Sequence, residues 1–362
     1  MTLLTELNFD KILEDIKPSA AEVEKVKLLS NGLISIINGL AAENGIDAEA
    51  MLVGSVAKGT WLSGKAVKDN ADIDLLIKFP LTTSLNDLKR CGLFLGEKCI
   101  EMVKGYAEKR YASHPYVTGH IDGYDIDFVP CYSIKDARQL KSAVDRTLLH
   151  TLYIQNKLKN EKKDEVRLLK KFMESVGTYG SEFKVGGFAG YLCELLILYY
   201  GSFQDVLNAA ATRWHPHYQI DLEKYGTAEL FKEPLVVVDP VDKKRNVAAP
   251  LTQQKMSEFM VAAYNFTKNP SQEYFYPKKV EHDLNLIKEE FKERGTHTVL
   301  LIFKPPSIPA DAIYPQIKKT ENSLVNLSER EDFKVFGSDF WTDEKKKVII
   351  LLEFSKLCLL FP

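Results

Sequence analysis

The chain has 362 residues, of which 45% are hydrophobic and 27% are charged, and its formal net charge is -2. This length allows two or three domains, and the composition is ordinary for a globular protein. A charge so close to zero excludes a general electrostatic attraction to nucleic acid, so any such binding must use a local basic patch.

Nothing in the sequence predicts secretion or a membrane span. The segment Met1–Lys17 carries four acidic side chains and no long apolar core, so no secretion signal is visible. The apolar run at 191–200 is interrupted by Glu194 and is too short to cross a bilayer. The five cysteines lack C-x-x-C spacing, and although Cys91 and Cys99 suggest a disulfide or metal pair, the odd count and apolar neighbours favour buried thiols. We therefore expect a cytoplasmic protein in a reducing compartment, without membrane contact.

The first part of the chain predicts a small mixed sheet with helices. Ser19 followed by Glu22 is a capping box, and the helical pattern that follows ends at Asn44-Gly45. The later elements expected here, in chain order, are a strand at 50–53, a turn at Gly54-Ser55 into a short helical stretch, a strand at 72–79, a helix at 88–109, and a hairpin of 110–118 and 120–129 that turns at Gly119 or Gly123.

Two aspartates, Asp72 and Asp74, alternate along the apolar run of the 72–79 strand. In a strand, residues i and i+2 face the same side, so the two carboxylates project together. Like charges at that distance repel unless a cation lies between them, and oxygen-only ligands suit Mg²⁺ held jointly with substrate phosphates. A third carboxylate is expected from Asp125 or Asp127, which share a face and which periodicity cannot distinguish.

The Gly54-Ser55 turn lies upstream of these carboxylates and offers free backbone N–H groups, as phosphate-binding turns do. Each signal has a simpler explanation, because an isolated D-x-D pair is often solvated and Gly-Ser is also a common helix cap. Together, in one compact domain, they predict nucleotidyl transfer assisted by two Mg²⁺ ions.

From about residue 142 the pattern becomes helical. The expected elements, in chain order, are helices at 144–158, 165–176 and 187–200, a segment punctuated by Pro and Asn at 236–249, a helix at 252–266, and a final unit with a strand at 298–303, a helix at 315–331 and strands at 333–340 and 347–354. The final β-α-β-β unit is half of a split βαβ sandwich.

Three features of the helical part have two interpretations each. His150 as a lone histidine is more often structural than catalytic. Lys170 and Lys171 lie in a basic stretch that begins at Lys157, and this stretch is either a solvated face or a phosphate-binding surface. Arg245, in a turn, either caps a helix or contacts a base edge or phosphate.

The chain resembles the archaeal, class I, CCA-adding enzymes, which are tRNA nucleotidyltransferases, from about residue 20 to its end. The motifs that carry the resemblance stand in the family's order: VGSVAKGTWL at 53–62, ADID at 71–74, HPYV at 114–117, DFVPCY at 127–132, KSAVDRT at 141–147, VRLLK at 166–170, GYLCELL at 190–196, VDPVD at 238–242 and KRNVAA at 244–249.

The resemblance implies an α+β architecture with a DNA polymerase beta-type nucleotidyltransferase head at 1–141, a helical neck at 142–269 and a C-terminal body and tail unit at 270–362. It implies template-independent addition of C, C and A to the 3′ end of tRNA from CTP and ATP, with Mg²⁺ as cofactor. The implied metal ligands and catalytic residues are Asp72, Asp74 and Asp127, and the implied nucleotide contacts are Gly54, Ser55, Lys58, His150, Lys170, Tyr179 and Arg245.

Several departures from the family's pattern affect these expectations. Lys58 stands where arginine is common, so the charge is kept without the bidentate fork, and Asp72 stands where glutamate is common. The chain also stops earlier than family members, so we expect an incomplete C-terminal unit. Because the family holds the tRNA body with its C-terminal domains, an incomplete unit would weaken tRNA binding. Its exposed apolar residues and unpaired sheet edge would favour self-association, including a homodimer. These residues are Leu357, Leu359, Leu360 and Phe361.

Two alternative functions fit parts of the sequence. A poly(A)-polymerase-like or oligoadenylate-type transferase would use ATP only, and Arg245 together with the long C-terminal region argues against it. A tRNA-binding module with a vestigial active site would lack a carboxylate, whereas Asp72, Asp74 and Asp127 are all present.

Overall fold

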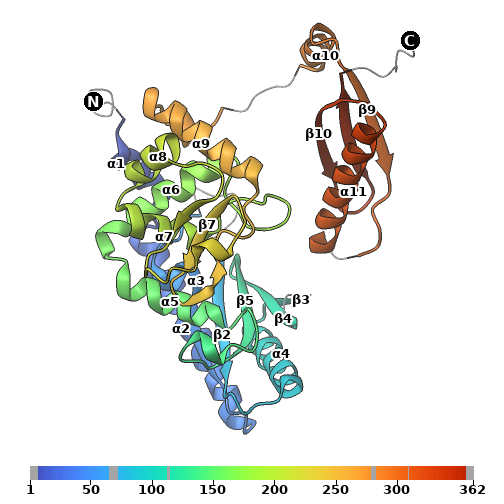
Figure 1. Cartoon of the computed structure of the whole chain (residues 1–362). Helices are drawn as coiled ribbons and strands as arrows, with labels where there is room; N and C mark the ends of the chain where they lie inside the picture. The colour runs from blue at the N-terminus through green and yellow to red at the C-terminus, as the bar shows by residue number, and fades with distance from the viewer. Residues whose placement is uncertain (1–6, 65–71, 112–114, 279–282, 309, 356–362) are drawn as a thin grey trace. The chain divides into compact units, whose positions relative to one another are not determined.

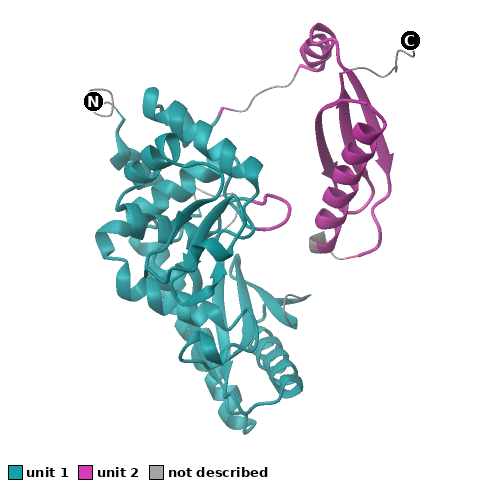
Figure 2. Cartoon of the chain, in the orientation of Figure 1, with its two compact units in different colours: residues 1–181, 187–277 teal, residues 182–186, 278–362 magenta. Residues whose placement is uncertain are grey.

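The computed structural model describes residues 7–64, 72–111, 115–278, 283–308 and 310–355. The chain separates into two compact units, one formed by Met1–Ser181 with Gly187–Pro277 and the other by Glu182–Gly186 with Lys278–Pro362 (Figure 2). Each unit is described by itself. Helices and strands mix in both, as the predicted α+β class requires (Figure 1).

The first unit contains a five-stranded mixed sheet in the order β1-β2-β5-β4-β3. Its strands are β1 (Glu49–Val53), β2 (Ile73–Phe79), β3 (Tyr106–Tyr111), β4 (Pro115–Ile121) and β5 (Tyr124–Tyr132). Only β2 and β5 are parallel neighbours, and the other pairs are antiparallel. Parallel pairing aligns the same ends of β2 and β5, which brings residues at the beginning of each strand side by side.

Two helices, α2 (Ala20–Glu43) and α4 (Leu85–Met102), contact each other and pack on this sheet. The predicted capping box of α2 is confirmed, because Ser19 accepts from the backbone of Glu22 and Glu22 accepts from the backbone of Ser19. Helix α2 buries Val26 and Leu33, whereas Val23 stays exposed.

The predicted end of α4 and the predicted hairpin need correction. The helix ends at Met102 rather than at 109, because Lys104 takes a left-handed conformation, with φ 58°, and Gly105 follows. The following residues form β3, so the hairpin predicted at 110–129 is a three-stranded meander. Of the two alternatives for the turn, Gly123 is correct, with φ 83°, whereas Gly119 lies inside β4 against Ile100.

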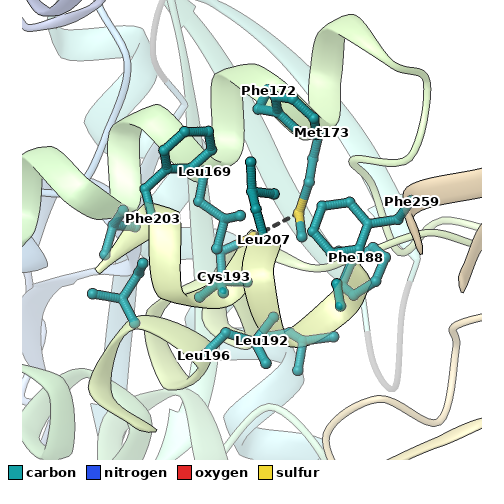
Figure 3. Packing of buried hydrophobic residues seen from close by; sticks show 14 of the residues in the cluster. Leu169, Phe172, Met173, Phe188, Leu192, Cys193, Leu196, Phe203, Leu207 and Phe259 are labelled. Atoms are coloured by element: carbon teal, nitrogen blue, oxygen red, sulfur yellow. Dashed lines mark hydrogen bonds between the residues drawn. The ribbon is translucent and has the colours of Figure 1, made fainter. Parts of the chain in front are cut away.

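A second apolar core in the same unit lies among helices (Figure 3). The helices around it are α1 (Phe9–Ile16), α5 (Arg146–Lys157), α6 (Lys163–Ser175), α7 (Gly190–Tyr200), α8 (Phe203–Thr212) and α9 (Gln253–Lys268). Phe172 is fully buried and packs edge-on against Phe203, Phe259 and Phe266. Helix α1 buries Ile12 and Ile16 here, so this N-terminal segment packs with the helical part and not with the sheet core to which we had expected it to belong.

The sequence did not predict the small sheet inside the helical part. Strands β6 (Tyr218–Ile220), β7 (Leu235–Asp239) and β8 (Asp242–Asn246) pair in the order β6-β7-β8. Every residue of β7 is buried, and a short, continuously apolar run has no alternation that would identify it as a strand. The tight β7–β8 turn places Asp239 and Arg245 on one hairpin.

The second unit confirms the predicted β-α-β-β order. After α10 (Leu284–Glu293) come β9 (His297–Phe303), α11 (Ala310–Arg330), β10 (Val335–Thr342) and β11 (Val348–Phe354), with an antiparallel sheet in the order β10-β11-β9. Buried residues of α11 and β11, including Ile313, Ile317 and Ile350, form its core. The apolar residues expected to favour self-association, from Leu357 to Phe361, lie outside the described residues.

The expectations about a membrane span and about cysteine pairing can be compared with the described residues. None of the helices among them is both long and apolar enough to cross a bilayer. Cys91, Cys99, Cys131 and Cys193 are buried free thiols, so the disulfide or metal pairing suggested for Cys91 and Cys99 is absent from this part of the chain.

The close packing of α4 on the sheet predicts an asymmetric effect of two glycine substitutions. A Cβ at Gly92 would lie 2.5 Å from the Cβ of Pro130, so Gly92→Ala should destabilise the protein by roughly 1–3 kcal/mol. Gly32 in α2 is exposed with open space around it, so Gly32→Ala should stabilise by about 0.5–1 kcal/mol. Urea unfolding curves measure both changes, and equal stability of the two variants would mean that α4 lifts from the sheet without cost.

Candidate active site

The carboxylates predicted from the sequence meet at one end of the sheet. In the parallel β2–β5 pair, Asp74 is the register partner of Asp127, and Asp72 stands immediately before β2. On the other side of β2, Asp74 is paired with Val53, the residue before Gly54. The strand order therefore places the predicted phosphate turn beside the predicted metal ligands.

Gly54 is required at this turn for two reasons. Its φ of 69° is left-handed, and a Cβ built on it would lie 1.9 Å from Oδ2 of Asp74. Any other residue would be strained and would collide with the carboxylate. Ser55 follows in the short helix α3 (Gly54–Lys58), where its carbonyl accepts a hydrogen bond from Thr60 N–H.

The two candidates for the third carboxylate differ in their surroundings. Asp127 is half-buried, and its Oδ1 accepts a hydrogen bond of 2.6 Å from the Thr118 hydroxyl on β4. Asp125 is exposed and lies 2.6 Å from Nδ1 of His120. Because Asp127 is in register with Asp74, the geometry favours Asp127 as the third carboxylate.

Electrostatics at this site favour binding of a cation. Burial, followed by the charges of Asp127 and Asp72, raises the pKa of Asp74 to about 7, and Lys58 acts in the opposite direction. Burial also raises the pKa of Asp127, while the Thr118 hydroxyl opposes the shift. Three carboxylates that oppose each other's ionisation are the hard oxygen donors that Mg²⁺ prefers.

In the described part of the chain, no three His, Cys, Asp or Glu side chains converge closely enough to hold a metal ion as they stand. Metal binding by Asp72, Asp74 and Asp127 therefore stays a prediction, which the donor chemistry and the raised pKa of Asp74 favour.

A buried polar cluster joins the phosphate turn to the helical part. Glu194 of α7 is fully buried, and its Oε2 lies 2.6 Å from Nζ of Lys58, which is 7% exposed. Its Oε1 accepts a hydrogen bond of 2.5 Å from the Thr60 hydroxyl. Lys170 of α6 is 2% exposed and donates to the Thr60 carbonyl at 3.0 Å. Burial lowers the pKa of Lys170, an effect that Glu194 opposes.

Further contacts hold the same turn from the helical side. Arg167 of α6 donates to the carbonyls of Trp61, at 3.0 Å, and Gly59, at 2.6 Å. Gln155 of α5 donates to the carbonyl of Ala57 at 2.9 Å. Arg167, Lys170 and Lys171 are all buried and contact protein groups, so these three residues of the basic stretch are not a solvated face.

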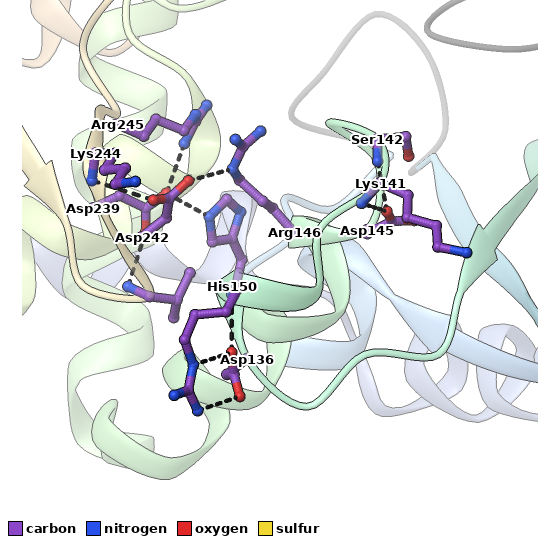
Figure 4. A network of polar contacts seen from close by, with 12 residues as sticks. Asp136, Lys141, Ser142, Asp145, Arg146, His150, Asp239, Asp242, Lys244 and Arg245 are labelled. Atoms are coloured by element: carbon purple, nitrogen blue, oxygen red, sulfur yellow. Dashed lines mark hydrogen bonds and ion pairs between the residues drawn. The ribbon is translucent and has the colours of Figure 1, made fainter. Parts of the chain in front are cut away.

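A second polar cluster surrounds Asp239 at the end of β7 (Figure 4). Its Oδ2 lies 2.8 Å from Nε2 of His150 and 2.9 Å from Nη1 of Arg245. Arg245 lies on β8, so the alternative that it caps a helix is wrong. His150 and Arg245, which the resemblance assigned to the nucleotide, are therefore brought together, although they are far apart in sequence.

Tyr191 links the two clusters. The Tyr191 ring stacks on the imidazole of His150, with 3.9 Å between centroids. The Lys58 ammonium lies 5.6 Å from the centroid of the same ring. Tyr179 lies near Lys170 across Gly190, because a Cβ at Gly190 would be 3.1 Å from the Tyr179 hydroxyl and 3.4 Å from Nζ of Lys170. The predicted nucleotide contacts thus form one connected region beside the carboxylates, and their roles remain predictions.

Sequence reasoning missed several residues of this region. Glu194 had been noted only as an interruption of an apolar run, and Asp239 only as part of a turn. A charged residue inside a buried helix or at the end of a buried strand needs a partner. That signal was present in both segments, but the sequence does not say which partner is near.

The Glu194 cluster predicts a large stability effect of one substitution. Glu194→Ala leaves the ammonium group of Lys58 buried without its carboxylate, which should cost about 3–5 kcal/mol of unfolding free energy. Glu258, whose carboxylate pairs with Lys255 on the surface of α9, is a matched control, and Glu258→Ala should cost less than about 1 kcal/mol. Chemical unfolding measures both, and similar losses would contradict the importance of the buried pair.

Comparison with known families covers most of the chain. Residues 33–150 match the model described as nucleotidyltransferase domain, residues 164–276 that of tRNA nucleotidyltransferase, second domain, and residues 294–359 that of CCA-adding enzyme, C-terminal domain. The fold is similar to that of a cytoplasmic RNA terminal U-transferase, with a TM-score of 0.57 and 15% identity over 75% of this chain and 98% of that chain. It is also similar to a structure of Cid1, described for its RNA terminal uridylyl transferase activity, with a TM-score of 0.59 and 14% identity over 76% of this chain and 98% of that chain.

Curated relatives are much closer in sequence. The chain is 56% identical to the CCA-adding enzyme of Methanothermobacter thermautotrophicus, over 96% of this chain and 75% of that protein. It is 38% identical to the CCA-adding enzyme of Pyrococcus abyssi, over 94% of this chain and 76% of that protein. The chain thus spans about three quarters of the length of these relatives and belongs to the family of CCA-adding enzymes, the tRNA nucleotidyltransferases.

Proposed function

We propose that this enzyme adds C, C and A to the 3′ end of tRNA in the cytoplasm, without a nucleic-acid template, from CTP and ATP and with release of pyrophosphate. The observation that carries the proposal is the pairing of Asp74 with Asp127 beside the left-handed turn at Gly54. The relatives named CCA-adding enzymes support the choice of substrates.

In this proposal, Asp72, Asp74 and Asp127 hold Mg²⁺ through their oxygens. When bound, the metal lowers the pKa of the attacking 3′ hydroxyl and neutralises charge on the triphosphate. The carboxylates themselves would orient the cation, with Asp74 and Asp127 held side by side by the strand register.

The nucleotide would lie along the region that joins the two polar clusters. Backbone N–H groups of Gly54 and Ser55 suit the triphosphate, with Lys58, Lys170 and Tyr179 nearby. Two buried lysines, Lys58 and Lys170, thus lie near the single buried carboxylate of Glu194. An anionic ligand beside the turn would be a further partner for these two amino groups.

Base selection without a template requires protein groups that distinguish C and A from U and G. Arginine has donors only. It therefore complements the unprotonated ring nitrogen that cytosine and adenine present, and it opposes the ring N–H that uracil and guanine present there. Arg245, whose guanidinium is one third exposed, is placed for this role in the proposal.

Incubation of the purified protein with Mg²⁺, each labelled nucleotide and tRNA that lacks its CCA end tests the proposal. C must be incorporated twice and A once, in that order. Incorporation of A alone would support a poly(A)-polymerase-like transferase instead.

The metal-binding part of the proposal predicts the effect of removing each carboxylate. Asp72→Ala, Asp74→Ala and Asp127→Ala should each slow transfer by several orders of magnitude, because metal-bound charge stabilisation is lost, while tRNA affinity changes little. Asp125→Ala removes an exposed carboxylate of the same strand, so it should retain most of the activity. Turnover close to wild type in any of the first three variants would refute the assignment.

The base-selection part predicts a change in preference rather than in rate alone. Arg245→Ala should lower the ratio of incorporation of CTP and ATP to that of UTP and GTP by about tenfold or more, because a wrong base no longer leaves a polar group unpaired. Lys244, its exposed neighbour on β8, provides the control variant Lys244→Ala. Single-turnover assays with all four nucleotides give the ratio, and uniformly slower transfer at an unchanged ratio would mean that Arg245 holds phosphate.

A further inference from the structure

Asp239 is fully buried, and both of its carboxylate oxygens are occupied (Figure 4). Oδ2 lies 2.8 Å from Nε2 of His150 and 2.9 Å from Nη1 of Arg245. Oδ1 accepts a hydrogen bond of 3.1 Å from Val241 N–H and a longer one of 3.5 Å from the Tyr191 hydroxyl. One carboxylate therefore fixes three side chains that belong to α5, α7 and β8.

The position of this carboxylate is set by rigid structure. Asp239 is the last residue of β7, in which all five residues are buried, and the hydrogen bond from Val241 closes the turn into β8. Burial opposes ionisation of Asp239, but the contacts with His150, Val241 and Arg245 outweigh it and lower the pKa of the carboxyl below its ordinary value. Asp239 is thus an anion at neutral pH and can only accept hydrogen bonds.

The carboxylate of Asp239, which can only accept a hydrogen bond, lies next to Nε2 and so determines the chemical form of His150. Burial lowers the pKa of His150, with further contributions from Arg245 and Lys58, whereas Asp239 opposes the shift; the net lowering favours the neutral imidazole. A neutral imidazole carries one proton, and the Asp239 anion places it on Nε2. Nδ1 is then an acceptor, and among the described residues no hydrogen bond to it is formed. The stacking of the ring on Tyr191 fixes its plane.

We propose that Asp239 is a positioning residue for base selection, which holds Arg245 as a pure donor and His150 as a Nδ1 acceptor toward the incoming nucleotide base. This inference rests on the proposed function, because it names how that site would discriminate among nucleotides.

The combination matches the chemistry shared by the two substrates. Cytosine and adenine both present an amino donor next to an unprotonated ring nitrogen, whereas uracil and guanine present a carbonyl next to a ring N–H. A donor-only guanidinium and an acceptor imidazole complement the first pair and oppose the second. If His150 carried its proton on Nδ1, this discrimination would be lost while the overall charge stayed the same.

The first test needs no nucleotide. Long-range ¹H–¹⁵N spectra of protein labelled with ¹⁵N-histidine report which nitrogen of each ring carries the proton, and the spectrum of His150→Gln identifies the signal among the seven histidines. Wild-type protein should show His150 with Nε2 protonated. A wild-type signal with Nδ1 protonated overturns the proposal, even if every Asp239 variant fails to fold.

The second test uses Asp239→Asn, in which an amide replaces the carboxylate at nearly unchanged volume. The proposal predicts a loss of the fixed tautomer and a fall of about tenfold or more in the preference for CTP and ATP over UTP and GTP, with a smaller effect on kcat for CTP. The double variant with Arg245→Ala should lose less than the sum of the two single losses, because both act on one interaction. Asp242→Asn, which alters the neighbouring ion pair with Arg146 and the hydrogen bond from Lys244 N–H but leaves Asp239 in place, is the control.

The outcomes separate this inference from the proposed function. A folded Asp239→Asn protein that keeps its tautomer and its preference overturns the positioning role, while addition of C, C and A by the wild type still supports the proposed function. A wild type that fails to add C and A to tRNA refutes the proposed function, whereas the tautomer of His150 still decides whether Asp239 fixes the imidazole.

Discussion

The buried carboxylate of Glu194 is the interaction on which the candidate site depends. It stands on a helix of the apolar core, yet both of its oxygens bond to residues of the turn that follows β1, Lys58 and Thr60. A buried carboxylate without such partners would be strongly unfavourable. The Glu194 charge therefore has its partners only when this turn lies against α7. The turn brings Gly54 and the carboxylate edge of the sheet with it. The cost of burying the ions thereby fixes how the two apolar cores of this unit meet.

The same constraint connects nucleotide chemistry with nucleotide recognition. The Lys58 ammonium lies between Glu194 and the face of Tyr191, and Tyr191 in turn supports His150 and reaches Asp239. A displacement of the turn at one end would alter the stacking, and thus the orientation of His150, at the other. These side chains are packed and hydrogen-bonded to one another. The groups proposed to select the base therefore have little freedom to move independently of the groups proposed to hold the phosphates.

The parts of this arrangement that sequence could predict are local. The capping box of Ser19 and Glu22, the alternation of Asp72 and Asp74, and the β-α-β-β order near the C-terminus each depend on a few neighbouring residues, and the structure contains these elements. The choice of Asp127 over Asp125 depends on the parallel register of β2 and β5, which is a tertiary property; the resemblance supplied it, whereas periodicity did not. Glu194 and Asp239 were missed as site residues because their partners lie 136 and 89 residues away in sequence. Strand β7 was missed because full burial removes the polar-apolar alternation that identifies a strand.

The lysine at position 58 acquires a different meaning in this setting. From sequence, replacing the family's common arginine by lysine suggested a weaker phosphate contact, because the guanidinium fork is lost. In the structure, the site offers a compact space between a carboxylate and an aromatic face, with Lys58 only 7% exposed. A point-like ammonium with three donors suits that space, and it can keep its bond to Glu194 while a further donor remains for an anion. The planar guanidinium is larger and directs its donors in a fixed fork, so an arginine would meet Glu194 in a different geometry. The lysine is therefore best understood together with Glu194 and Tyr191, as one part of the packing that joins the turn to the helices.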